Sequence, residues 1–352
     1  MRRSTTTRLT AVLLTVGLLA ACGADETADP ADAEAPAGTP VVSGAFGEPP
    51  SIELPTGVAG DELVVEILEE GDGATVEDGQ VIVANYQGVI WSGAGAAEGD
   101  TSTSTSGTAG SGSTSAAPVF DTFASGLPEA FTLTAEQVLK GMQDGLVDTT
   151  VGSRVMIVVP PAEGFGEQGQ QEIGVGPTDT LVFVFDVLDS FQGDQAAEGV
   201  EVAADPALPT VEESDSGPTA TMPATPAPTE LISHVLVQGD GAPVETGQLL
   251  VAQYRGQLYK DGSEFDSSWS RGAPTGFPIG VGRVISGWDK TLVGQAIGSR
   301  VLLVIPPAEG YGEGGNPPTI AGDDTLVFVV DILGAYGDGA PAPGEPSATP
   351  TG

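Results

Sequence analysis

Apolar and polar positions along this chain predict short β-strands separated by turns, with little helix. Residues 249–259 (LLVAQYRGQLY) partly alternate between apolar and polar positions, which is the pattern of a strand with one buried face. Residues 301–305 and 326–333 are short apolar runs rich in β-branched residues, which is typical of strands buried on at least one face. The C-terminal part of the chain is therefore expected to form several strands of one sheet.

The interval between these strands predicts one helix, from Ser286 to Ile297. Ser286 and Asp289 match a capping-box pattern at its start, and Gly298 can end it. The apolar side chains of this segment would share one helix face; they are Trp288, Leu292 and Ala296. Several strands with one helix predict an α+β fold, in which the helix covers one face of an antiparallel sheet.

The same pattern occurs twice. Residues 152–167 (GSRVMIVVPPAEGFGE) are nearly repeated at residues 298–313 (GSRVLLVIPPAEGYGE). The spacing between the copies is too long for a solenoid and indicates two tandem globular domains. We expect the first domain at residues 61–191 and the second at residues 230–336.

The segments outside the two domains are rich in Ala, Pro, Gly and acidic residues. Such segments bury little apolar surface, so we expect residues 23–60 to be a disordered tether and residues 337–352 a disordered tail. Residues 192–229 are interpreted as a Pro- and Ala-rich linker of the same kind. Within the first domain, residues 92–118 form a Gly/Ser/Thr-rich insert that the second domain lacks, and we expect a mobile surface loop there.

Residues 1–22 are typical of a targeting segment. Basic residues precede an apolar core at residues 9–19, which is too short to span a bilayer comfortably. The following Leu19-Ala20-Ala21-Cys22 resembles a bacterial lipobox, which implies cleavage before Cys22 and lipidation of that cysteine. The alternative is an ordinary signal peptide that happens to contain a cysteine. We therefore expect an extracytoplasmic protein that is anchored to the cell membrane through Cys22.

Charge excludes some classes of function. The chain has 11 Lys plus Arg against 49 Asp plus Glu, for a formal net charge of −38. Such a surface repels nucleic acid, so we expect no nucleic-acid partner. No segment has the residue spacing of a calcium loop, and we expect no metal and no cofactor. A polysaccharide- or metal-binding surface protein has only the acidity in its favour.

Five separated motifs of the second domain carry a family resemblance. They are Tyr254-x-Gly256, Phe265-Asp266-Ser267-Ser268, Val284-Ile285-x-Gly287-Trp288, Pro306-Pro307-x-x-x-Tyr311-Gly312 and Thr325-Leu326-Val327-Phe328. In order and spacing this domain resembles the FKBP-type peptidyl-prolyl isomerases. The resemblance implies a half-wrapped antiparallel sheet with one short helix across it, and an apolar pocket between the two.

The same resemblance implies site residues. Trp288 would form the pocket floor, Asp266 and the Tyr311 hydroxyl would supply polar contacts, and the Ile285 N–H would bind a substrate carbonyl. The substrate-binding walls would be Tyr254, Phe265, Val284, Ile320 and Phe328. This sequence departs from the family pattern on one wall, where Thr275 stands in place of a frequent Phe, and on the overhanging loop, where Asn316 replaces a frequent His.

The first domain carries a degenerate version of this pocket. Its corresponding residues are Tyr86, Phe120, Asp121, Val138, Leu139, Met142, Phe165 and Phe183. Met142 replaces Trp288 and provides no rigid aromatic plane, and Phe165 replaces Tyr311 and has no hydroxyl. We expect this domain to be folded but weakly active or inactive.

The sequence thus predicts a monomeric, membrane-anchored isomerase that acts on proline-containing exported polypeptides. Rotation about an X–Pro amide needs no nucleophile, metal or cofactor. The single histidine, His234, lies in the entry strand of the second domain, and we assign it no catalytic role. The alternative is a non-catalytic chaperone or scaffold that binds substrates in the same clefts.

Overall fold

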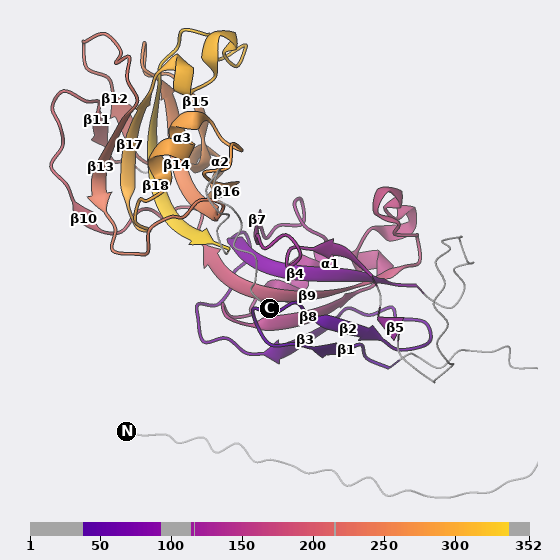
Figure 1. The fold of residues 1–352 in the computed structure, drawn as a ribbon. Coiled ribbons are helices and arrows are strands. Elements are labelled where there is room, and N and C mark those ends of the chain that lie inside the picture. The colour runs from indigo at the N-terminus through magenta and orange to yellow at the C-terminus, as the bar shows by residue number, and fades with distance from the viewer. Residues whose placement is uncertain (1–37, 93–113, 116, 215, 338–352) are drawn as a thin grey trace, which may run out of the picture. The chain divides into compact units, whose positions relative to one another are not determined.

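The computed structural model describes residues 38–92, 114–115, 117–214 and 216–337. Over these ranges the chain forms two large antiparallel β-sheets, two small ones of two or three strands, and few and short helices (Figure 1). The predicted α+β architecture with two similar domains is confirmed. The predicted signal segment with Cys22, most of the insert and the C-terminal tail after Gly337 lie outside the described residues.

The first domain is built on a sheet with strand order β3-β8-β9-β4-β6, and β7 pairs with the first residues of β4, next to β6 along the same edge. The strands are β3 (Val64–Glu69), β4 (Val81–Trp91), β6 (Pro118–Asp121), β7 (Glu129–Thr132), β8 (Arg154–Val159) and β9 (Thr180–Phe191). One α-helix, α1 (Lys140–Leu146), and three 3₁₀ turns, η1 (Pro161–Glu163), η2 (Gly166–Gln168) and η3 (Gln171–Ile173), complete it.

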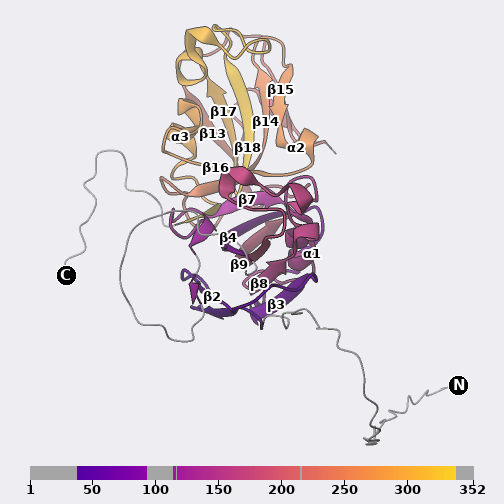
Figure 2. The same cartoon turned by 90° about the vertical axis from the view of Figure 1, so that its right-hand side faces the viewer.

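The second domain repeats this order as β13-β17-β18-β14-β15, with β10 added beside β13, and β16 pairs with β14. Its long central strands, β14 and β18, lie side by side (Figure 2). The strands are β10 (Val200–Glu201), β13 (Ile232–Gln238), β14 (Leu249–Leu258), β15 (Glu264–Ser267), β16 (Thr275–Pro278), β17 (Arg300–Ile305) and β18 (Leu326–Tyr336). The helices are α2 (Ser268–Arg271), α3 (Ser286–Leu292), η4 (Pro307–Glu309) and η5 (Gly312–Gly314).

Each of the helices α1 and α3 packs closely on its sheet because glycine faces the strand beneath. A Cβ atom at Gly141 would lie 2.6 Å from Val159 Cγ1, and one at Gly287 would lie 2.8 Å from Ile305 Cδ1. Both distances are shorter than real Cβ contacts, so only glycine permits this approach. The two glycines therefore determine how closely each helix approaches its sheet. They thereby also position the next residue, which is Met142 in α1 and Trp288 in α3.

The predicted helix from Ser286 to Ile297 is shorter than expected, because α3 ends at Leu292. The predicted capping box is wrong: the N-cap is Ile285, and no side chain caps the helix. The Ser286 hydroxyl donates instead to Glu309, at 2.5 Å, and the Asp289 carboxylate accepts hydrogen bonds from a preceding turn. Both side chains that the local pattern assigned to the helix cap thus form hydrogen bonds with other parts of the domain instead.

Two segments that we expected to be disordered contain strands and cover the sheets. In the first domain β1 (Val41–Ser43) and β2 (Ser51–Leu54) pair with each other, and β2 pairs with β5 (Thr114–Ser115). In the second domain β11 (Thr210–Glu212) pairs with β12 (Thr219–Thr221). The prediction of disorder is therefore wrong for residues 38–60, and residues 192–229 are more ordered than their composition indicates.

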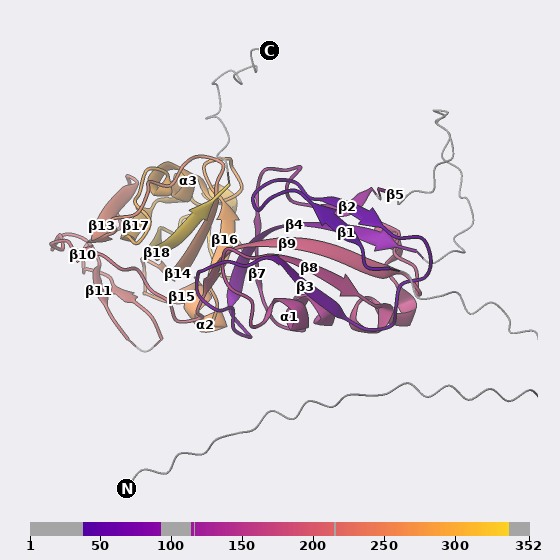
Figure 3. The same cartoon turned by 90° about the horizontal axis from the view of Figure 1, so that it is seen from below.

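These covering segments, which we call straps (residues 38–60 and 196–225), bury the sheet face opposite the helix. Figure 3 shows β1 and β2 on one side of the first sheet and α1 on the other. The first strap packs on Met156 and Val158 of β8, and the second packs on Leu302 and Val304 of β17. The strands beneath are therefore apolar on both faces.

A buried arginine–aspartate pair holds each strap. Arg154 donates to Asp186 at 2.6 and 2.8 Å and also to the carbonyl oxygens of Gly44 and Glu48 in the first strap. Both ionic side chains are almost fully buried, as the repeat places them on adjacent strands, β8 and β9. The pair therefore binds backbone groups that the strap brings to the sheet.

The second domain has the same pair. Arg300 donates to Asp331 at 2.5 and 2.6 Å, forms an ion pair with Glu213 of the strap, and Asp331 accepts from the Ala197 N–H at 3.0 Å. Both sheets thus use one charged pair as the anchor of a covering segment.

The helices of the described ranges are all too short or too polar to span a membrane.

Candidate functional site

A cavity of about 530 Å³ lies over the second sheet, next to α3. Its lining comes from four strands, from α3 and from the loops that precede α3 and follow η4. The lining residues are Tyr254, Phe265, Asp266, Phe277, Arg283, Val284, Ile285, Ser286, Trp288, Gly310, Tyr311 and Phe328. The cavity is therefore mainly aromatic and aliphatic, with a few polar groups at its edge.

Most of the residues that sequence motifs assigned to the pocket line this cavity. Of the predicted set, Ile320 alone is outside the lining; it is 3% exposed and belongs to the apolar core. Its backbone bonds Asn316 at 2.8 and 3.0 Å, so it closes the loop that overhangs the site. Phe277, Arg283, Ser286 and Gly310 are additional lining residues that the motifs did not assign to the pocket.

Trp288 forms an aromatic floor that three other rings enclose. Its ring centroid lies 5.3 Å from Tyr254, 5.2 Å from Phe277 and 5.3 Å from Phe328, with interplanar angles of 88°, 75° and 81°. These edge-to-face contacts are a favoured arrangement of aromatic rings. Only 3% of the tryptophan is exposed, and its indole N–H has no hydrogen-bond partner in the described residues.

Phe277 provides an aromatic side chain on the wall where Thr275 has none. It extends from β16, whose register with β14 places Phe277 opposite Leu250. Its ring contacts both Tyr254, at 5.7 Å, and Trp288. The wall on which Thr275 stands in place of a frequent Phe is therefore closed in part by the ring two residues farther along.

Gly256 explains why the Tyr-x-Gly motif is needed. A Cβ atom at this position would lie 2.6 Å from Phe265 and 2.8 Å from Phe328. These two rings pack against each other at 5.4 Å with an angle of 86°, directly over the glycine. The missing side chain thus leaves room for the aromatic wall.

Asp266, Tyr254 and Arg271 form a polar network at one edge of the cavity. The Tyr254 hydroxyl donates to Asp266 at 2.6 Å, and Arg271 donates to both Asp266 and the Tyr254 oxygen. Burial, together with the Asp266 carboxylate and against the opposing effect of Arg271, raises the pKa of Tyr254 to about 12. The phenol therefore stays protonated at neutral pH and holds the carboxylate in place.

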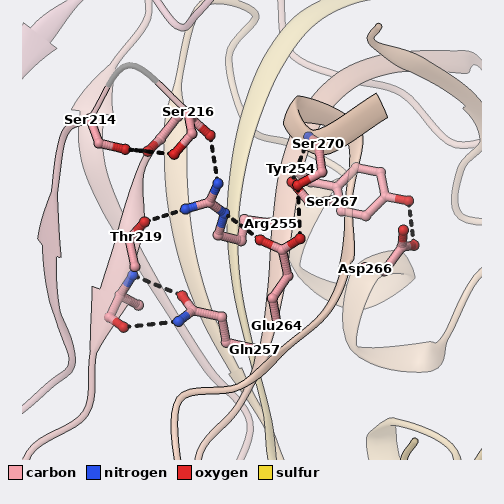
Figure 4. A network of polar contacts seen from close by, with 12 residues as sticks. Ser214, Ser216, Thr219, Tyr254, Arg255, Gln257, Glu264, Asp266, Ser267 and Ser270 are labelled. Atoms are coloured by element: carbon pink, nitrogen blue, oxygen red, sulfur yellow. Dashed lines mark hydrogen bonds and ion pairs between the residues drawn. The ribbon is translucent and has the colours of Figure 1, made fainter. Parts of the chain in front are cut away.

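Successive residues of β14 connect the cavity to the strap. Figure 4 shows Tyr254 directed to Asp266, while Arg255 reaches the strap and binds the Ser216 carbonyl and Thr219. Arg255 also pairs with Glu264, at 3.0 Å. Because side chains alternate along a strand, the cavity and the strap lie on opposite faces of one sheet.

A turn before α3 fixes the cavity rim. The Asp289 carboxylate accepts the N–H groups of Gly280, at 2.6 Å, and Gly282, at 2.8 Å. Both glycines have φ near +76°, a conformation that other residues adopt rarely. No hydrogen-bond partner for the Ile285 N–H occurs among the described residues, so this donor at the rim is free for a ligand.

Tyr311 stands at the opposite edge. It is 41% exposed, and its hydroxyl has no partner among the residues that the structure describes. The preceding turn is tied to α3 because Glu309 accepts hydrogen bonds from Ser286 and Lys290. The Lys290 ammonium beside it lowers the pKa of Glu309, so the tie persists at neutral pH.

Comparison with known proteins identifies the family. A family model described as FKBP-type peptidyl-prolyl cis-trans isomerase matches residues 73–188 and 241–333. The chain belongs to this isomerase family. The resemblance that the motifs carry is thus confirmed for both domains.

Two relatives described as FK506-binding proteins agree with the assignment. The chain is 38% identical over 117 residues to an FK506-binding protein of Streptomyces anulatus, over 33% of this chain and 94% of that protein. It is 36% identical over 118 residues to a probable FK506-binding protein of Corynebacterium glutamicum, over 34% and 98%. A crystal structure of AtFKBP13 is 36% identical over 31% of this chain and 94% of that chain, with a TM-score of 0.29. Each match is about one domain long.

The first FKBP-type domain builds its floor differently. Met142 replaces Trp288 and is 9% exposed. Phe185 is paired with Tyr86 in the sheet, at the register position where the second domain pairs Val330 with Tyr254. The Phe185 ring stacks on Tyr86 at 5.1 Å with an angle of 29°. A strand phenylalanine, which the motif comparison missed, therefore supplies the aromatic ring that the helix lacks.

Polar contacts in the first domain are also rearranged. The Tyr86 hydroxyl donates to Glu129 at 2.5 Å, and burial together with this carboxylate raises the tyrosine pKa. Asp121 accepts from Gln87 and from the Ala124 N–H instead. The acid that corresponds to Asp266 is thus detached from the tyrosine.

The remaining predicted residues of the first domain gather around the same core. Phe120 contacts Phe183 at 5.5 Å, and four side chains pack against its apolar cluster: Tyr86, Val138, Leu139 and Phe165. No group of three or more metal-ligating side chains occurs in the described residues of either domain.

Proposed function

We propose that the cavity of the second domain catalyses cis/trans rotation about X–Pro amides in exported polypeptides. Three edge-on aromatic rings around the buried Trp288, below a cavity of about 530 Å³, are the observation that supports this proposal most directly. A proline ring is apolar and compact, and it fits a site of this lining. Catalysis is assigned to Asp266, Tyr311, Trp288 and Ile285.

The chemistry requires only differential binding of the twisted amide. The planar amide is separated from its isomer by roughly 18–20 kcal/mol. In the twisted form resonance is lost and the carbonyl oxygen carries less negative charge, so an apolar, water-poor cavity favours it over the polar planar form. The Ile285 N–H and the Tyr311 hydroxyl then hold neighbouring carbonyl groups of the substrate in a turn. Each tenfold acceleration needs about 1.4 kcal/mol of such discrimination.

Phe265, Val284 and Phe328 would contact the proline ring, and Tyr254 would keep Asp266 in position. We assign the first domain little activity, because it has neither the indole floor nor the Tyr311 hydroxyl. It would act as a spacing or substrate-holding module. The substrates would be proline-containing polypeptides that fold outside the cytoplasm.

The lipobox-like pattern that ends at Cys22 supports an extracytoplasmic location. We propose that the protein is monomeric and is attached to the cell membrane through a lipid on this cysteine. Metabolic labelling with radioactive palmitate tests the attachment: the full chain should incorporate label, and a Cys22→Ser variant should not. Equal labelling of both proteins would refute the lipid anchor.

Catalysis is tested with the full chain in a protease-free peptide assay. Asp266→Val should reduce kcat/KM by about tenfold or more, whereas the matched Asp121→Val in the first domain should change it little. Circular dichroism of both variants verifies folding. A full chain that is no faster than the uncatalysed reaction, yet binds unfolded polypeptides, would replace the isomerase by the non-catalytic chaperone.

A further inference from the structure

Arg283 differs from the other basic residues of the described chain, because it forms no salt bridge there. The others each pair with a carboxylate; they are Lys140, Arg154, Arg255, Lys260, Arg271, Lys290 and Arg300. The chain carries 49 Asp and Glu and a formal net charge of −38. An arginine without a partner on so acidic a protein has its donors available to a ligand.

The position of Arg283 connects this cation with the isomerase cavity. Arg283 is exposed and belongs to the cavity lining, two residues before the free Ile285 N–H. Its backbone is fixed by the turn in which Asp289 accepts the N–H groups of Gly280 and Gly282. The cation is therefore held at the rim, where the chain flanking a bound proline must leave the cavity.

The other charged groups near the cavity already have partners. Asp266 binds Tyr254 and Arg271, and Glu309 binds Lys290. A carboxylate that arrives with a substrate therefore meets one uncommitted cation, Arg283. A guanidinium can donate two parallel hydrogen bonds to a carboxylate, which an ammonium cannot do in this geometry.

The first domain lacks this feature. Gln137 precedes Val138 as Arg283 precedes Val284, and its side-chain oxygen accepts the Thr132 N–H at 3.4 Å. A neutral amide thus occupies the corresponding position in the domain without the indole floor. The cation occurs only beside the cavity that we assign to catalysis.

We propose that Arg283 forms a carboxylate-binding subsite, so that the second domain prefers X–Pro segments with an Asp or Glu close to the proline. The proposal rests on the isomerase function proposed above. The acidic surface repels such segments at long range, and the subsite offsets that repulsion at the point of binding.

The test uses pairs of peptides with Glu or Gln on either side of the proline, acetylated and amidated so that no terminal carboxylate competes. With the full chain at low salt, kcat/KM from NMR exchange should favour a Glu peptide over its Gln partner by about threefold to tenfold. High salt should reduce the ratio. Arg283→Gln should bring it to about one, and Arg283→Glu should invert it. Lys260→Gln, which removes a charge remote from the cavity, should leave the ratio as it is.

The outcomes separate this proposal from the previous one. Equal catalysis of Glu and Gln peptides by the full chain would overturn the subsite and leave the isomerase intact. A preference that persists in Arg283→Gln would place the carboxylate contact elsewhere and overturn the assignment. Absence of catalysis for every peptide would refute the isomerase itself.

Discussion

Trp288 stands edge-on to Tyr254, with ring centroids 5.3 Å apart and 88° between the ring planes. In the first domain Tyr86 has Phe185 beside it instead, 5.1 Å away and nearly parallel. The tyrosine of each domain therefore has an aromatic neighbour. In the second domain that ring comes from the helix and lines the cavity, whereas in the first it comes from the sheet itself.

Trp288→Met, which copies the residue of the first domain, should lower kcat/KM by about tenfold to hundredfold. The smaller, flexible side chain loses the rigid apolar floor that favours the twisted amide, and each tenfold corresponds to about 1.4 kcal/mol. Peptide exchange by NMR measures the rate, and a thermal unfolding curve shows whether the variant is folded. A folded Trp288→Met chain with undiminished kcat/KM would remove the indole from the mechanism.

Tyr311→Phe should lower kcat/KM severalfold and leave the unfolding midpoint unchanged. The side chain is 41% exposed and its hydroxyl has no partner in the described structure, so the fold does not depend on it. A single neutral hydrogen bond to the substrate accounts for about 0.5–1.5 kcal/mol. The first domain already carries Phe165 at this position. Should the variant lose stability instead of activity, the hydroxyl would have a structural role.

Activity should be constant from neutral pH to about pH 10 and fall between 10 and 12. Burial raises the pKa of Tyr254 from 10.0 to about 12, so the folded chain holds the phenol proton more tightly than the unfolded chain does. The stability that this provides is complete below pH 10 and is lost as the pH rises through 12. Rates and unfolding midpoints measured over this range test it. A decline that begins below pH 9 would contradict a protonated tyrosine beside Asp266.

Arg300→Met should destabilise the second domain by about 3–5 kcal/mol, because it leaves Asp331 buried without its cation. The double variant Arg300→Met/Asp331→Leu should recover most of that loss, since no buried charge remains. Urea unfolding of the full chain, followed by Trp fluorescence, compares the two. A double variant that is less stable than Arg300→Met would show that the strap requires its contacts with Arg300 and Asp331, and not only the removal of a buried unpaired charge.

The family and most of the cavity could be predicted from the five motifs. The spacing of these motifs reflects the positions that residues must occupy around a bound proline. At Gly256, for example, a Cβ atom would clash with Phe265 and Phe328, so the motif requires glycine there. Arg283 and Phe277 were missed for a different reason. The role of Arg283 depends on its lack of a salt-bridge partner, and the role of Phe277 depends on the direction of its ring from β16. Neither property can be predicted from the neighbouring sequence.

The order of the straps could not be predicted from their composition. Residues 38–60 and 192–229 have the composition of disordered chain, yet a few apolar residues such as Ile52 and Val211 suffice to order them. A signal did exist: the run from Val301 to Ile305 is apolar at every position, and a strand of this kind is buried on both faces. Composition describes the covering segment alone, whereas its order depends on the surface it covers.

The sequence by itself determined the duplication, the strand pattern, the isomerase family and the residues around Trp288, because these follow from repeats, periodicity and steric requirements. Only the tertiary structure decided that α3 ends at Leu292, that Phe185 supplies the ring of the first domain, and that Arg283 stays unpaired. Each of these depends on contacts between residues distant in sequence, whose energies are set by packing and by competition for partners.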